Sequence, residues 1–129
     1  MPELSPETHA SLLEQMQNLR AQIEKQREKT WAARTALRTL TGPQLKMGQI
    51  TLIDELDKEI KLVEKLQGVY LRLEKMSLVV EIETELRDLR QSRKTQEAHL
   101  EGNRHAALKS LLANVDIVLG RKKHSQGDS

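Results

Sequence analysis

The chain has 129 residues, 37% of them apolar and 31% charged, and a formal net charge of +2. It has one Trp, one Tyr and no Phe, which argues against a compact core filled by aromatic side chains and favours narrow aliphatic seams between long helices. The absence of cysteine excludes disulfides, thiolate metal sites and a cysteine nucleophile, and no apolar run approaches the roughly 20 residues that span a bilayer.

The first predicted helix spans residues 6–41. Ser5 before Pro6 is typical of a helix start, because serine accepts hydrogen bonds from free backbone amides and proline suits the first turn. The end is expected at Thr41-Gly42-Pro43, where glycine can adopt the left-handed conformation and proline discourages continuation. Between these limits, positions 12 to 40 follow an alternating four-three spacing, the period of a coiled-coil seam.

That seam is aliphatic at both ends and weaker in the middle. Its apolar members are Leu12, Met16, Leu19, Ile23, Leu37 and Leu40, and its middle holds Gln26, Thr30 and Ala33. Polar seam residues set the register and the partner, and they lower stability. Two interpretations of the middle stay open: a weak, water-accessible segment, or a match to one specific partner residue.

The flanks of the seam carry positive rather than negative charge. Arg20, Arg27 and Arg34 recur every seven residues, and Trp31 lies beside the seam on its outer side. The opposite flank has Gln15, Gln22 and Lys29. A parallel homodimer would place Lys29 against Arg34 without a compensating charge, so pairing with an acidic helix is favoured.

The second predicted helix spans residues 44–101 and forms an antiparallel hairpin with the first. In the stretch from Val69 to Ile82, apolar side chains cover more than one side of the helix: Val69, Tyr70, Leu71, Leu73, Met76, Leu78, Val79, Val80 and Ile82. Leu86 and Leu89 follow as further candidate partner contacts. A helix of this length would extend beyond its partner by several turns and leave part of that apolar stretch uncovered. We therefore expect obligatory association with another chain.

A third, short amphipathic helix is predicted over residues 104–119, after a break at Gly102-Asn103. Its apolar face holds Leu108, Leu111, Leu112 and Val115. Residues 1–119 are expected to form a single elongated coiled-coil domain. Residues 120–129 are too polar to be buried and are expected to form a flexible tail containing the basic run Arg121-Lys122-Lys123.

The sequence offers no signature of catalysis, of cofactor binding or of metal binding. The histidines are His9, His99, His105 and His124, and no pair of them has the spacing of metal ligands on a helix. No phosphate-binding glycine loop or nucleophile motif occurs. We therefore expect that the protein is not an enzyme and has no cofactor and no catalytic residue. From the absence of cysteine and of a long apolar run we also expect an intracellular protein, of the cytoplasm or nucleus, that does not bind membranes.

The all-α pattern favours a non-enzymatic coiled-coil scaffold subunit of a hetero-oligomeric complex, of the cytoskeletal, kinetochore or tethering type. The expected partners are other helical chains, bound through the apolar and arginine residues named above together with Trp31. Two alternatives stay open. One is a regulatory adaptor or chaperone-like hairpin that binds a partner segment, and the other is a nucleic-acid-associated protein that uses the basic C-terminal end for weak, salt-sensitive binding.

Overall fold

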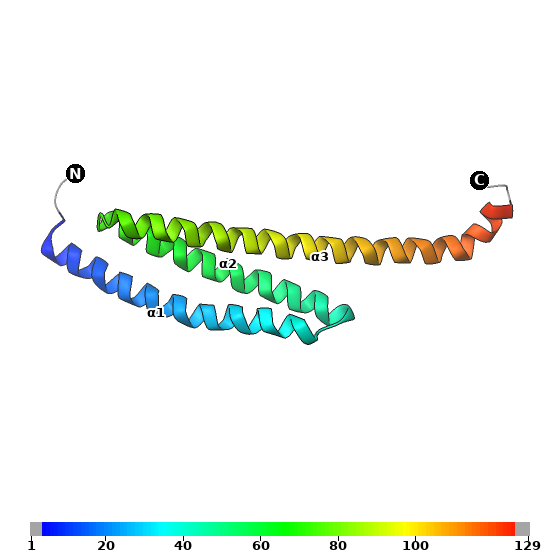
Figure 1. The fold of residues 1–129 in the computed structure, drawn as a ribbon, viewed down its shortest axis with the longest axis horizontal. Helices are drawn as coiled ribbons and strands as arrows, with labels where there is room; N and C mark the ends of the chain where they lie inside the picture. Colours follow the sequence, from blue (N-terminus) through cyan, green and yellow to red (C-terminus); the bar gives the residue numbers. More distant parts are fainter. Residues whose placement is uncertain (1–3, 126–129) are drawn as a thin grey trace. The chain divides into compact units, whose positions relative to one another are not determined.

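A computed structural model describes the backbone of residues 4–125 and the side chains of residues 4–102. Over these residues the chain is all-α and has no strand, which confirms the predicted fold class. Its elements are α1 (Pro6–Ala36), a short 3₁₀-helix η1 (Leu37–Thr39), α2 (Gly42–Arg72) and α3 (Met76–Ser125) (Figure 1). The chain divides into two units, the first ending at Glu97 and the second beginning with Ala98.

The first helix begins as predicted, and it ends at Ala36 rather than at residue 41. The side chain of Ser5 accepts a hydrogen bond from the Thr8 amide at 3.1 Å, and Pro6 occupies the first turn. At the other end, α1 passes into η1, and the backbone turns at Gly42, whose φ is +61°. Only glycine adopts this left-handed conformation without a steric penalty, so the predicted break after residue 41 is confirmed.

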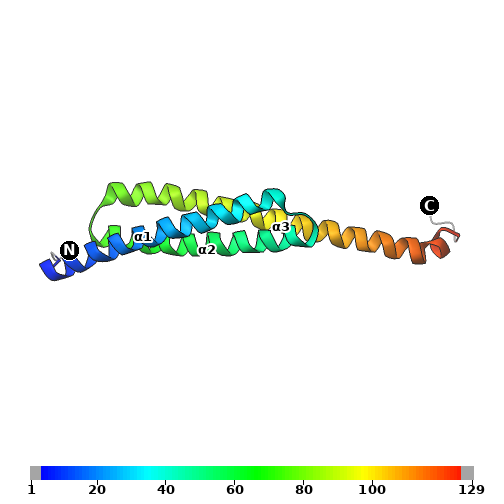
Figure 2. The same cartoon turned by 90° about the horizontal axis from the view of Figure 1, so that it is seen from below.

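The four-three spacing of α1 marks its inward face. Every seam position from Leu12 to Leu40 is buried or half-buried. A second seam with the same spacing, not identified from the sequence, runs along α2: Leu45, Gln49, Leu52, Leu56, Glu59, Val63, Leu66, Tyr70 and Leu73, all likewise buried or half-buried. The two helices pack along these seams in antiparallel orientation, as the hairpin prediction requires (Figure 2).

The prediction of one continuous helix over residues 44–101 is wrong, because α2 ends at Arg72 and the chain reverses before α3. Glu74 adopts the left-handed conformation with a φ of +58°. The Lys75 amide donates to the Tyr70 carbonyl at 2.9 Å, and the Glu74 amide donates to the Leu71 carbonyl at 3.1 Å. This pair of bonds is the Schellman motif, which satisfies the free carbonyls at the end of a helix.

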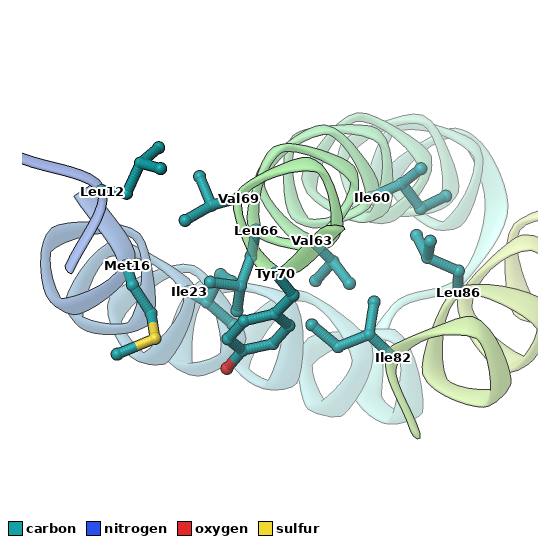
Figure 3. Packing of buried hydrophobic residues seen from close by; sticks show 10 residues of the cluster. All are labelled: Leu12, Met16, Ile23, Ile60, Val63, Leu66, Val69, Tyr70, Ile82 and Leu86. Atoms are coloured by element: carbon teal, nitrogen blue, oxygen red, sulfur yellow. The ribbon is translucent and has the colours of Figure 1, made fainter. Parts of the chain in front are cut away.

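The beginning of α3 packs back against the hairpin and covers part of the apolar stretch from Val69 to Ile82. Ile82 and Leu86 of α3 join the same core as Val63 and Tyr70 of α2 (Figure 3). Ion pairs Asp57–Arg93 and Glu64–Arg90, with a hydrogen bond between Gln67 and Glu83, fix the antiparallel register of the two helices. Within the first unit the fold is therefore a three-helix bundle, and burial of this stretch does not require a second chain.

The predicted break at Gly102-Asn103 is wrong, because α3 continues through it to Ser125. A lone glycine lowers helix stability by about 1 kcal/mol relative to alanine but does not end a helix by itself. The described residues form three α-helices, the number expected, but the boundary between the second and the third lies at residues 73–75. The apolar residues Leu108, Leu111, Leu112 and Val115 lie outside the described side chains. The segment expected to be a tail, 120–129, overlaps the end of α3, and residues 126–129 lie outside the description.

Replacing Glu74 with glycine should stabilise the protein. A non-glycine residue in the left-handed region is strained by about 1 kcal/mol, and glycine removes this strain. We expect Glu74→Gly to raise the free energy of unfolding by about 0.5–1 kcal/mol in urea denaturation followed by circular dichroism. The matched control Glu81→Gly, at an exposed position inside α3, should lower it by about 1 kcal/mol. A loss of stability in both variants would contradict the turn at Glu74.

Candidate protein-interaction surfaces

The structure places most of the predicted partner-binding residues inside the chain's own bundle. Leu12, Met16, Ile23, Tyr70, Ile82 and Leu86 are buried, and Leu19, Leu73, Val79 and Leu89 are partly buried against them. Leu37 and Leu40 pack at Gly48, where a Cβ atom would lie 2.6 Å from Leu40 Cδ1. Trp31, Met76 and Val80 remain exposed. Among the predicted apolar partner residues whose side chains the structure describes, these three are the most exposed.

The arginine row of α1 meets the bundle's own helices. Arg20 Nε donates to the Tyr70 hydroxyl at 2.9 Å, and its guanidinium lies 5.5 Å from the centre of that ring. Arg27 forms an ion pair with Glu85, and the hydrogen bond to this carboxylate raises the pKa of Arg27. Arg34 donates to Ser92 Oγ at 3.0 Å. The arginine row predicted pairing with an acidic helix. For Arg27 this helix is α3 of the same chain, through Glu85.

The weak middle of the α1 seam is a hydrogen-bonded polar layer. Gln26 Nε2 donates to the Glu55 backbone carbonyl at 3.1 Å and to Glu55 Oε2 at 2.6 Å. The Thr30 hydroxyl donates to the Gln26 carbonyl at 3.0 Å. Of the two interpretations left open, the structure supports the specific match, because Gln26 is buried and its partner lies on α2. Such a layer favours one register of the α1–α2 pair over its neighbours.

Glu59 is a buried carboxylic acid next to this layer, with only 5% of its surface exposed. Burial raises its pKa; the Thr30 hydroxyl and the charges of Arg27 and Arg34 act in the opposite direction, and Glu85 adds to the rise. Because the folded-state pKa exceeds the unfolded one, the acid stabilises the fold at low pH, and this contribution is lost as the pH rises through the folded-state pKa.

Glu59→Gln should therefore raise the melting temperature at pH 7 by a few degrees, on the order expected for a single buried group. The gain should disappear as the pH is lowered below the usual pKa of a glutamic acid, where the wild-type side chain is also neutral. Thermal melts from pH 3 to pH 8 would measure both effects. The exposed Glu28→Gln should leave the melting temperature nearly unchanged. A Glu59→Gln variant less stable than wild type at pH 7 would contradict this prediction.

The groove between α1 and α2, on the side that α3 does not line, is open. Near the hairpin turn it holds a hollow of about 410 Å³. The lining residues are Ala33, Ala36, Leu40, Pro43, Gln44, Met47, Gly48 and Thr51. Met47 at this hollow is 63% exposed. Apolar side chains and small residues at an open groove between helices suit the side chains of a further helix.

A second hollow of about 490 Å³ lies further along the same groove. It is lined by Gln15, Asn18, Leu19, Gln22, Lys65, Gly68, Val69 and Arg72. Its apolar part, Leu19 and Val69, is bordered by cations rather than by acids. The seven-residue spacing of Lys58, Lys65 and Arg72 is visible in the sequence, but the α2 seam had to be recognised before these residues could be assigned to the outer side of the hairpin.

A smaller exposed apolar patch lies beside the α2–α3 turn. Leu71 is 46% exposed, Met76 57% and Val80 65%. Met76 precedes Val80 by one helical turn on α3, and Leu71 lies in the last turn of α2, just before the chain reverses. Met76 and Val80 were predicted as partner contacts, whereas Leu71 was noted in the apolar stretch but not selected as a contact.

No protein-family model, curated protein or solved structure matches this chain. Among the described residues, no helix is both long enough and apolar enough to cross a membrane. The same part of the chain contains no group of three or more histidine, cysteine or acidic side chains placed to hold a metal ion.

Proposed function

We propose that this chain is a non-enzymatic helical scaffold subunit that assembles with other protein chains through the outer surface of its three-helix bundle. The observation that carries this proposal is the open apolar hollow of the α1–α2 groove, with Met47 exposed beside it. A contiguous apolar surface of this kind marks a protein contact more often than a scattered exposed side chain does. A further helix laid into the groove would extend the packing of α1 and α2 toward a four-helix arrangement.

The manner of assembly differs from the one that the sequence suggested. The seam of α1 and the buried residues Val69, Tyr70 and Ile82 pack within the chain, so the bundle has its own core before any partner arrives. The subunit then presents a preformed surface, and only the side chains at that surface are ordered on binding. Preorganisation of this kind lowers the entropic cost of association. Such a surface suits a subunit of a hetero-oligomeric complex.

Site-specific photo-crosslinking in the native cell tests this function. A photoreactive amino acid replaces Met47 at the hollow in one variant and Gln91, an exposed residue of α3 outside the groove, in the control. We expect a discrete adduct with another protein from position 47 and not from position 91. Light scattering of the purified chain separately determines whether a second copy occupies the surface. Identical adducts at both positions, or none at position 47, would contradict the proposal.

A further inference from the structure

We propose that the segment bound in the α1–α2 groove is an acidic amphipathic helix, an inference that rests on the function proposed above and names the chemistry of the partner. Exposed cations lie on both helices that form the groove, and two of them, Lys65 and Arg72, line its second hollow. These cations are Lys25 and Lys29 on α1, and Lys61, Lys65 and Arg72 on α2. Acidic side chains near the groove include Asp54 and Glu55, both within ion-pair distance of Lys58, at 3.1 and 3.4 Å, and Glu7, which lines a smaller hollow together with Arg72.

The groove differs in this respect from the two sides of the bundle that α3 lines. On the α1–α3 side, Arg27 is paired with Glu85, and on the α2–α3 side Arg93 is paired with Asp57. Within the described residues, none of the five groove cations is within ion-pair distance of a carboxylate. These exposed, unpaired cations beside the open groove attract a partner of opposite charge.

The floor of the groove identifies the partner as a helix rather than a nucleic acid. The two hollows are lined at their base by Leu40 and Ala36 at one end and by Leu19 and Val69 at the other. From Gln15 to Ala36, α1 spans about 30 Å, the length of a helix of about 20 residues. Leu and Ala side chains along one face of such a helix would fill both hollows, and Asp or Glu on its flanks would meet the cations. Nucleic acid would satisfy the charges but leave the apolar floor unused.

A substitution at Gly68 can test binding in this groove without disturbing the fold. It lies in the middle of α2, it helps to line the second hollow, and a Cβ atom added to it would meet nothing within 4 Å. A glycine inside a helix lowers stability relative to other residues, and no contact within the bundle requires it here. Gly68→Leu should therefore fold at least as well as wild type while placing a side chain in the path of a docked helix.

Fluorescence anisotropy with the full chain and two designed peptides provides the test. Both peptides are about 20 residues long and share the same Leu and Ala face, one with Glu and the other with Lys at the flanking positions. We expect the Glu peptide to bind about tenfold more tightly at low salt, the effect of a few exposed charge pairs, and this preference to shrink as salt is added. Lys65→Glu/Arg72→Glu should abolish the preference, and the control Arg87→Glu/Lys94→Glu on α3 should keep it. Gly68→Leu should weaken binding at least tenfold with an unchanged or higher melting temperature.

Several results would overturn the inference. Equal binding of the two peptides, or binding of neither, excludes recognition of an acidic helix. Binding of a labelled DNA duplex that Lys65→Glu/Arg72→Glu removes, without peptide binding, would assign the groove to nucleic acid. Crosslinks from position 47 to a segment without an acidic flank would leave the assembly function standing and refute the acidic partner. Preference for the Glu peptide without any native crosslink would refute only the assembly function.

Discussion

Replacing Leu86 with alanine should lower the free energy of unfolding by about 3 kcal/mol, within the range for a buried leucine that leaves a cavity. Leu86 is 0% exposed and belongs to the core that α3 shares with α2, where it lies near Ile60 (Figure 3). Truncation removes this contact, and the surrounding helices can close the space only in part. Urea denaturation followed by circular dichroism would give the change directly.

The control for this variant is Leu71→Ala, the same substitution at a leucine that is 46% exposed. It should change the free energy of unfolding by well under half as much, because little of the side chain is removed from water in the folded state. The comparison tests the position of α3. If α2 and α3 formed one continuous helix, Leu86 would have no partner within the chain, and the two alanine variants would have similar small effects in a monomer.

The features that the sequence predicted correctly are those encoded by local chemistry. The cap at Ser5 and the turn at Gly42 each depend on a residue whose side chain or backbone suits that position better than most others do. The α1 seam was recognised from a four-three spacing that is sustained from residue 12 to residue 40 and is typical of a helix packed along one face. These signals need no knowledge of the rest of the chain.

The turn between α2 and α3 could not be read in this way. Its left-handed residue is Glu74, and glutamate favours the interior of a helix. The turn forms because it allows Ile82 and Leu86 to reach the core formed by α1 and α2, and this apolar burial outweighs the local strain. The position of the turn between α2 and α3 is therefore determined by tertiary packing and not by the local sequence.

The same error decided which residues were assigned to a partner. With α3 joined to α2, the apolar stretch from Val69 to Ile82 had no partner within the chain, and association was inferred from its exposure. Once α3 packs back, Val69, Tyr70 and Ile82 of that stretch are buried, and an open groove remains on the other side of the hairpin. Met47 was not selected from the sequence, and its exposure next to an apolar hollow is visible only when α1 and α2 are paired.

Val63→Asp should be the most damaging single substitution, lowering the free energy of unfolding by at least about 4 kcal/mol. Val63 is 0% exposed and lies in the core between Ile60 and Leu66, where α2 meets the other two helices (Figure 3). The substitution removes a buried apolar side chain and introduces a carboxylate one helical turn from buried Glu59. An unpaired charge in such a site is expensive because it loses its hydration without gaining a partner.

Val80→Asp is the matched control, since this valine is 65% exposed. It should keep the helical circular dichroism spectrum and lose less than about 1 kcal/mol of unfolding free energy, the helix-propensity difference between exposed residues.

Measurement of unfolding at two protein concentrations tests whether the core forms within one chain. Because Val63 packs inside one chain, the unfolding midpoints of wild type and Val80→Asp should not depend on concentration. A midpoint that rises with concentration, together with a dimer mass in light scattering, would show instead that this core forms between chains and that folding requires association.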